Sequence, residues 1–218
     1  LASSPSGAAA ARPGTGPWPE GPEAVFVGRD DELRQLREAL QEAREGRGRA
    51  VFVTGEPGSG KTALLAEFAS QVLSCEPDVA VAGGRCPLPA GPAEPCLPFR
   101  EALKVLSGDP DGGWLPARCP GYVPPALADW SRVLARALTG KADLLPGSRR
   151  TGPDQDPQAA GPEFLPGQVE ETLRAFARER PLVLLLDDVH WADPGSLVVL
   201  GRLARQLPRS RILLVASL

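Results

Sequence analysis

A short β-rich run, a glycine-rich turn and an amphipathic helical pattern follow one another without a break in residues 49–74. Residues 49–55, RAVFVTG, predict a strand that ends at Gly55, because valine and phenylalanine favour a pleated, half-buried surface. Residues 61–74, KTALLAEFASQVLS, predict a helix with one apolar face. The residues expected to point inward from this helix are Leu64, Leu65, Phe68, Val72 and Leu73. This arrangement predicts a strand–turn–helix unit of an α/β fold.

The turn in this unit, GEPGSGKT at residues 55–62, fits the pattern G-x-x-x-x-G-K-[ST] at every fixed position. Glycines let the main chain wrap closely around phosphates, and N–H groups at the helix start point at the anion. Lys61, which is unfavourable at a helix N-terminus without an anion, is expected to reach the β- and γ-phosphates, and the Thr62 hydroxyl to bind Mg²⁺. The alternative is a turn that only links strand to helix. The candidate nucleotide-binding residues are Thr54, Gly55, Glu56, Pro57, Gly58, Ser59, Gly60, Lys61 and Thr62.

Further strands and helices alternate along the chain. Apolar runs at residues 79–84, 182–186 and 211–217 predict three more strands, and helical patterns occupy residues 30–46, 99–106, 125–138 and 167–180. Asp193 is expected to cap a last helix, with Pro194 in its first turn. The apolar stripes of the helices are Leu33, Leu36, Leu40 and Ala43; Val169, Leu173 and Phe176; and Leu197, Leu200, Leu203 and Leu207. The alternation predicts an α/β fold with a parallel sheet covered by helices on both faces.

Two adjacent acids, Asp187 and Asp188, follow the apolar strand at residues 182–186. Like charges at close range disfavour each other, so a nearby cation is expected. Asp187 is placed to hold Mg²⁺ directly or through water, and Asp188 to orient or deprotonate an attacking water. The alternative is a strand that simply enters a turn, where Asp is common. His190 lies near this site or has a capping or packing role, whereas Trp191 and Asp193 are interpreted as structural.

Composition limits the class of protein. The 218 residues carry a formal net charge of -3, which gives no overall basic field for nucleic acid. The sequence has no run near the ~18 apolar residues of a membrane span and no secretory signal pattern. Four cysteines without a CxxC pair indicate free, packed thiols in a reducing, cytoplasmic setting. Residues 1–22 are interpreted as a disordered leader, and residues 23–218 as one core containing a loose, proline-rich helical insertion at 107–166.

Four segments resemble one known family. FVGRDDELRQL, VTGEPGSGKTALL, LLLDDVHWADPGSLVVL and RILLVAS, in this order, resemble the AAA-type ATPase domain of bacterial STAND signalling NTPases. This domain is also called the AAA-16 or origin-recognition-like ATPase domain, and it occurs in large LuxR-type transcriptional regulators. The resemblance covers residues 25–218, with the middle segment poorly matched.

The resemblance implies a P-loop NTPase fold and a set of site residues. Val27, Gly28 and Arg29 would lie beside the adenine of ATP, and residues 55–62 would be the Walker A loop. Asp187 would hold Mg²⁺ with Thr62, and Asp188 would be the catalytic acid, acting with Lys61. Many relatives have Glu in place of Asp188, which is one methylene shorter. The strand at 211–216 would lie between the two motif strands, with Ser217 near a phosphate-sensing position.

The resulting functional prediction is a Mg-ATP-dependent signalling switch that hydrolyses ATP slowly and belongs to a larger transcriptional regulator. We expect the chain to be an N-terminal fragment that stops before the helical lid, with self-association or partner domains in the full-length protein. DNA contact would occur only through a separate output domain, and no membrane partner is expected. Two alternatives remain: a DNA-processing or loading ATPase, and a nucleotide-binding interaction module without turnover. A small-molecule or protein kinase shares the phosphate loop but fits the paired acids less well.

Overall fold

The computed structural model describes residues 28–88, 95–107 and 164–218. The expectations for the leader at residues 1–22, for Val27, for the helix at 125–138 and for residues 108–163 of the insertion lie outside this part of the chain.

Four strands form a parallel sheet. They are β1 (Arg49–Val53), β2 (Ala80–Arg85), β3 (Leu182–Asp187) and β4 (Ile212–Ser217). The order across the sheet is β1-β4-β3-β2, and the neighbouring strands pair in parallel. The α/β prediction is therefore confirmed, and β4 lies between the two strands that precede the glycine-rich turn and the paired acids.

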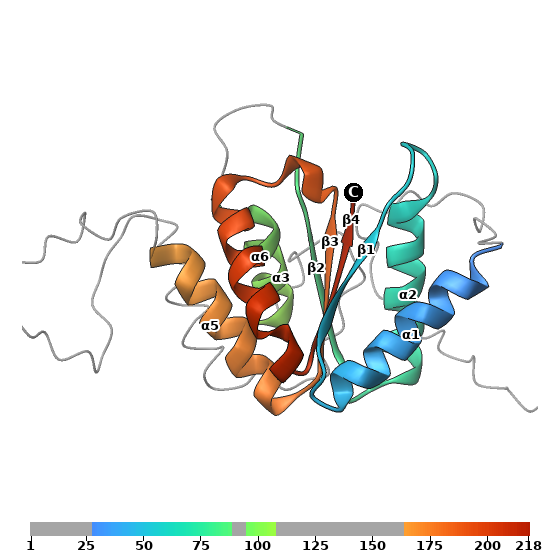
Figure 1. Cartoon of the computed structure of the whole chain (residues 1–218), viewed down its shortest axis with the longest axis horizontal. Helices are drawn as coiled ribbons and strands as arrows, with labels where there is room; N and C mark the ends of the chain where they lie inside the picture. Colours follow the sequence, from blue (N-terminus) through green and yellow to red (C-terminus); the bar gives the residue numbers. More distant parts are fainter. Residues whose placement is uncertain (1–27, 89–94, 108–163) are drawn as a thin grey trace, which may run out of the picture.

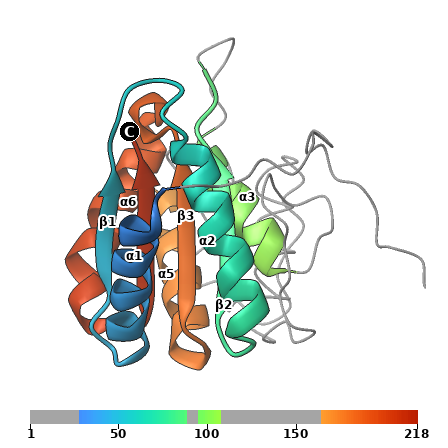
Figure 2. The same ribbon diagram turned by 90° about the vertical axis from the view of Figure 1, so that its right-hand side faces the viewer.

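Helices cover both faces of this sheet (Figure 1). The helices α1 (Asp30–Arg44) and α2 (Lys61–Cys75) pack on one face. The other face is covered by α3 (Leu97–Leu106), α5 (Phe164–Glu179) and α6 (Pro194–Gln206). Two short 3₁₀ turns, η2 (Val189–Trp191) and η3 (Leu207–Arg209), flank α6. Figure 2 shows the strands running to one edge, where the turn between β1 and α2 also lies.

Alternate residues of each central strand enter the two halves of the core. On β4, Leu213 and Val215 pack with α1 and α2, whereas Leu214 and Ala216 pack on the opposite side. All six residues of β3 are buried. A strand covered on both faces has no solvent side, which explains why its sequence is continuously apolar rather than alternating.

The predicted helical stripes are buried, with one exception. In α6, Leu203 and the following Leu207 are buried and Leu200 is partly buried, but Leu197 is 54% exposed. Residues three apart are offset by about 60° around a helix, so a strict three-residue spacing drifts away from the buried face. The buried face begins instead at Ser196 and continues through Val199.

The packing of β2 against α3 brings their backbones very close. A Cβ built on Gly84 would lie 1.9 Å from the carbonyl oxygen of Pro98. Only glycine permits this approach without a backbone shift. The contact fixes the end of β2, and therefore Arg85, beside the N-terminal half of α3.

Candidate functional site

The glycine-rich loop, residues 55–62, connects the end of β1 to the first turn of α2. Gly58 and Gly60 have φ angles of 80° and 82°, a region that favours glycine. A Cβ on Gly55 would lie 2.8 Å from the Ser59 hydroxyl oxygen, so the loop closes tightly on itself. Thr54, Glu56 and Pro57, also candidate binding residues, are exposed around this loop.

The start of α2 is suited to an anion. Gly60 is the N-cap and provides no side-chain hydrogen bond, and the first turn contains no acidic residue. The Ser59 hydroxyl is buried and has no hydrogen-bond partner among the described residues. The N–H groups at a helix start carry partial positive charge, so a phosphate here would be stabilised by them.

Lys61 folds back over the glycine-rich loop. Its Nζ donates hydrogen bonds to the carbonyl oxygens of Gly55, at 2.7 Å, and Glu56, at 3.2 Å. The Lys61 ammonium therefore lies against the first two residues of the loop, where its partners are neutral carbonyl oxygens. An anionic phosphate is a stronger partner for this cation than a carbonyl oxygen.

Arg29 contacts the glycine-rich loop as well. Its guanidinium donates a hydrogen bond to the Ser59 carbonyl. Gly28 before it is exposed and has a φ of 85°, and Val27 lies outside the described residues. The structure thus places Arg29 against the phosphate side of the predicted site, and its position relative to an adenine stays a prediction.

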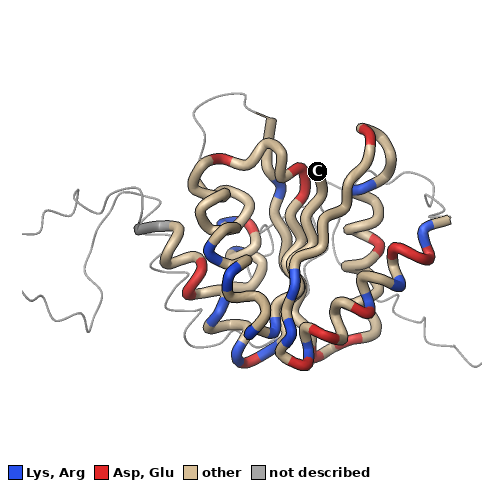
Figure 3. The backbone as a smooth tube through the Cα atoms, in the orientation of Figure 1, with Lys and Arg blue, Asp and Glu red and all other residues tan. Residues whose placement is uncertain are grey.

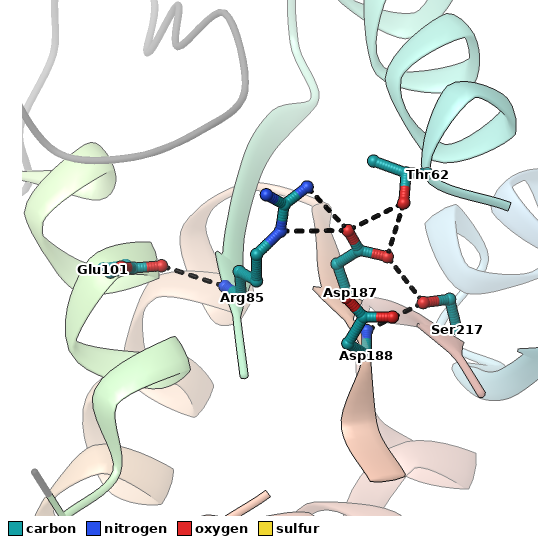
Figure 4. A network of polar contacts seen from close by, with 6 residues as sticks. All are labelled: Thr62, Arg85, Glu101, Asp187, Asp188 and Ser217. Atoms are coloured by element: carbon teal, nitrogen blue, oxygen red, sulfur yellow. Dashed lines mark hydrogen bonds and ion pairs between the residues drawn. The ribbon is translucent and has the colours of Figure 1, made fainter. Parts of the chain in front are cut away.

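Asp187 is the centre of a polar network at the end of β3 (Figure 4). Its carboxylate is fully buried and accepts a hydrogen bond from Thr62 Oγ1 at 2.9 Å. Ser217, the last residue of β4, donates to the other carboxylate oxygen at 2.6 Å. The guanidinium of Arg85 donates from Nη2 at 3.0 Å and from Nε at 3.2 Å. Three elements far apart in sequence therefore meet at one carboxylate.

Asp188 leaves the strand that Asp187 ends. Its φ of 57° lies in the left-handed region, and its backbone N–H donates to Ser217 Oγ at 2.8 Å. The turn separates the two acids, so that Asp187 points into the network while Asp188 is half-buried at its edge. Ser217 contacts both residues, so its buried hydroxyl has hydrogen-bond partners both as a donor and as an acceptor.

Arg85 is a residue of the candidate site that the sequence did not reveal. A bound cation was expected to compensate the paired acids, but the structure also provides this arginine, which pairs in register with Asp187. Its backbone N–H donates to Glu101 Oε2 at 2.9 Å. Burial raises the pKa of Glu101, and this hydrogen bond acts in the opposite direction. The available signal was a lone arginine directly after the predicted strand at 79–84.

His190, Trp191 and Asp193 follow Asp188 but are not among the described residues that hydrogen-bond to the Asp187 carboxylate. His190 and Trp191 are exposed, with their rings 5.1 Å apart. Asp193 caps α6 as predicted, by accepting a hydrogen bond from the Ser196 N–H at 3.1 Å. It also accepts one from the Cys96 N–H at 3.1 Å, which ties the start of α3 to the start of α6. These contacts give Asp193 a structural role.

Comparison with known proteins decides the family. The model of the family described as "AAA ATPase domain" matches residues 25–215. The chain belongs to the AAA ATPase domain family. As an AAA ATPase domain it is 26% identical over 194 residues to an uncharacterized protein of Rhizobium meliloti (strain 1021). That match covers 88% of this chain and 18% of the relative, so the AAA ATPase domain described here spans less than a fifth of the relative's length.

Two solved structures resemble this AAA ATPase domain at low identity. One is a chain of Drosophila ORC bound to DNA, with 20% identity, a TM-score of 0.39 and coverage of 86% of this chain and 76% of that one. The other is from Drosophila ORC bound to GC-rich DNA and Cdc6, with 20% identity, a TM-score of 0.37 and coverage of 91% and 54%. Among the described residues of the domain, no helix has the length and apolar character needed to cross a membrane.

Proposed function

We propose that this domain binds ATP with Mg²⁺ between the glycine-rich loop and Asp187, and that slow hydrolysis resets a signalling switch. The observation that carries the proposal is the 2.9 Å contact between the Thr62 hydroxyl and the Asp187 carboxylate. It joins the residue that ends the phosphate-binding pattern to the acid that ends a buried strand. This pairing supports the assignment of residues 55–62 as a Walker A loop and of Asp187 and Asp188 as a Walker B pair.

The loop would hold the phosphates through its main chain. Gly58 and Gly60 keep the backbone open on the inner side, and Ser59 has a buried hydroxyl without a partner in the described structure. Lys61 would exchange the carbonyl oxygens of Gly55 and Glu56 for phosphate oxygens. These features support phosphate binding because each supplies a donor or removes an obstructing side chain.

Thr62 and Asp187 would hold Mg²⁺ together. Hydroxyl and carboxylate oxygens are hard ligands of the kind that Mg²⁺ prefers, and Mg²⁺ usually takes only one or two carboxylates from the protein. When bound, the ion would neutralise charge on the β- and γ-phosphates. Asp187 is already oriented for this by the Ser217 hydroxyl.

Asp188 would orient or deprotonate the attacking water. Its turn out of β3 leaves the carboxylate half-buried beside Asp187 rather than inside the same network. An aspartate extends one methylene less than the glutamate common at this position in relatives. We therefore propose slow hydrolysis, which suits a switch whose two states depend on the bound nucleotide.

We further propose that residues 23–218 form the ATPase core of a larger regulatory protein. The match to only 18% of the length of the Rhizobium meliloti protein supports a role as one part of a longer chain. The described backbone carries both acidic and basic positions (Figure 3), and the net charge of -3 gives no overall basic field for DNA. We therefore favour control of partner domains by self-association or domain contacts over direct binding of DNA.

The test compares ATP binding with phosphate release. Lys61→Ala should weaken Mg-ATP binding, whereas Asp188→Asn should keep ATP affinity and lose hydrolysis. Lys104→Ala, which changes an exposed lysine of α3, is the matched control and should resemble the wild type. If Lys61→Ala and Asp188→Asn both bind and hydrolyse ATP like the wild type, the proposed site is wrong.

A further inference from the structure

We propose that Arg85 is an internal counter-cation of Asp187 and competes with Mg²⁺ for this carboxylate when nucleotide binds. Arg85 would thereby set the Mg²⁺ concentration at which nucleotide is bound. The inference rests on the proposed function, because it concerns the same carboxylate. It adds a residue from β2 to a site otherwise made by the glycine-rich loop, β3 and β4.

Asp187 is surrounded by several protein hydrogen-bond donors. A carboxylate has about four lone-pair sites for hydrogen bonds. In the structure Oδ2 accepts from Thr62 Oγ1 and from two nitrogens of Arg85, and Oδ1 accepts from Ser217 Oγ and, at 3.2 Å, from Thr62 Oγ1. The acceptor capacity of Asp187 is therefore filled by protein donors. Direct ligation of a metal ion requires at least one of these donors to move away.

Arg85 is the donor that can move away from Asp187. Ser217 is completely buried and also accepts a hydrogen bond from the Asp188 N–H, so it is fixed on two sides, and Thr62 would stay in place as a ligand of the same ion. The Arg85 side chain, by contrast, is 47% exposed and sits on a flexible stem. Its backbone N–H remains bonded to Glu101, so only the side chain has to swing out.

The positive charge of Arg85 compensates the negative charge of Asp187. The Asp187 carboxylate has no exposed surface, and a buried charge needs a partner. Arg85 supplies one positive charge and contacts the same oxygen, Oδ2, that accepts the Thr62 hydroxyl. A divalent ion at the Thr62–Asp187 contact would replace that compensation and repel the guanidinium. Arg85 and Mg²⁺ are therefore competitors for one carboxylate.

The experiment measures the Mg²⁺ concentration that gives half-maximal binding of a fluorescent ATP analogue held at a fixed concentration. Arg85→Gln should lower this Mg²⁺ midpoint by about tenfold, since a nearby like charge is removed. Arg85→Lys keeps the charge but loses the two-nitrogen contact, and its midpoint should fall between those of the wild type and the glutamine variant. Arg205→Gln, at an exposed position on α6, is the control and should leave the midpoint unchanged.

A second readout separates this role from a merely structural one. In EDTA, Arg85→Gln should unfold at a lower urea concentration than the wild type, because Asp187 loses its counter-charge. Mg²⁺ with the analogue should abolish that difference. If Arg85→Gln does not fold, the midpoint of Arg85→Lys decides: a value below the wild type supports the competition, and an equal or higher value overturns it.

Two negative results have different meanings. A wild-type domain with no Mg²⁺-dependent nucleotide binding would overturn the proposed function, and this inference with it. A wild type that binds with Mg²⁺, together with Arg85 variants of equal or higher midpoint, would overturn the inference alone.

Discussion

The Thr62 hydroxyl donates to the Asp187 carboxylate at 2.9 Å across a separation of 125 residues in the chain. Thr62 lies in the first turn of α2, and Asp187 is the last residue of β3. The parallel sheet brings them together because β1 and β3 both run to the same edge, on either side of β4. The proposed metal site is therefore a consequence of strand order rather than of sequence proximity.

Replacing Thr62 with valine tests whether the side-chain hydroxyl, rather than the side-chain volume, is needed for Mg-ATP binding. Thr62→Val keeps the side-chain volume but removes the hydroxyl that contacts Asp187. We expect Mg-ATP affinity to fall by about 10- to 100-fold, the range for losing one interaction with a charged group. Isothermal titration of Mg-ATP measures the change. Thr62→Ser retains the hydroxyl and should bind within a few-fold of the wild type; equal binding by all three proteins would contradict the metal assignment.

Ser217→Ala should destabilise the domain even without ligand. The hydroxyl donates to Asp187 and accepts from the Asp188 N–H, so its removal leaves two groups without this partner. We expect a loss of about 1–3 kcal/mol in the free energy of unfolding. Urea denaturation measures it, with Ser74→Ala, at an exposed helix position, as a control within about 0.5 kcal/mol of the wild type. A Ser217→Ala protein as stable as this control would argue against the network.

The glycines of β2 and α6 should respond to alanine in opposite directions. Gly84→Ala places a methyl group 1.9 Å from the Pro98 carbonyl oxygen and should cost at least about 2 kcal/mol, as in overpacked cores. Gly201→Ala meets nothing within 4 Å on an exposed helix and should stabilise by up to about 1 kcal/mol. Thermal unfolding gives both values. A neutral Gly84→Ala would show that β2 and α3 do not pack as described.

Cysteine reactivity should follow burial. Cys75 is exposed, whereas burial raises the pKa of Cys86 to about 12 and of Cys96 to about 11. The Asp193 carboxylate is the second, smaller contribution to both of these pKa values. In a Cys119→Ser background, a thiol reagent at pH 8 should therefore modify Cys75 rapidly, and Cys86 and Cys96 only after unfolding. Rapid modification of Cys86 in the folded protein would contradict the packing at the end of β2.

Local patterns predicted most of the elements but not every contact. The glycine-rich loop follows from backbone chemistry, and the continuous apolar run of β3 follows from burial on both faces, so each is visible in a short stretch of sequence. The prediction that Leu197 belongs to the buried face of α6 was wrong, because a three-residue spacing does not follow the helical period of about 3.6 residues. The prediction that cysteines act as packed apolar groups holds for Cys86 and Cys96 but is wrong for Cys75.

The tertiary contacts of the candidate site were harder to predict from the sequence. The pairing of Arg85 with Asp187 depends on β2 lying beside β3 in a defined register, and nothing near Arg85 in the sequence specifies that register. Likewise, the contact between Arg29 and the Ser59 carbonyl depends on how α1 packs beside α2. These contacts join residues from different parts of the chain, so they require the fold to be known first.

The most direct test of the central claim locates the divalent ion. Mn²⁺ in place of Mg²⁺, added with a non-hydrolysable ATP analogue, should broaden the amide NMR signals of residues 55, 56 and 58–62, Asp187 and Asp188 most strongly. Signals from Val79 and Ile212, at the opposite ends of the strands and about 15–20 Å away, should broaden least. Strongest broadening at that opposite edge, or equal broadening throughout, would contradict a metal and nucleotide site between Thr62 and Asp187.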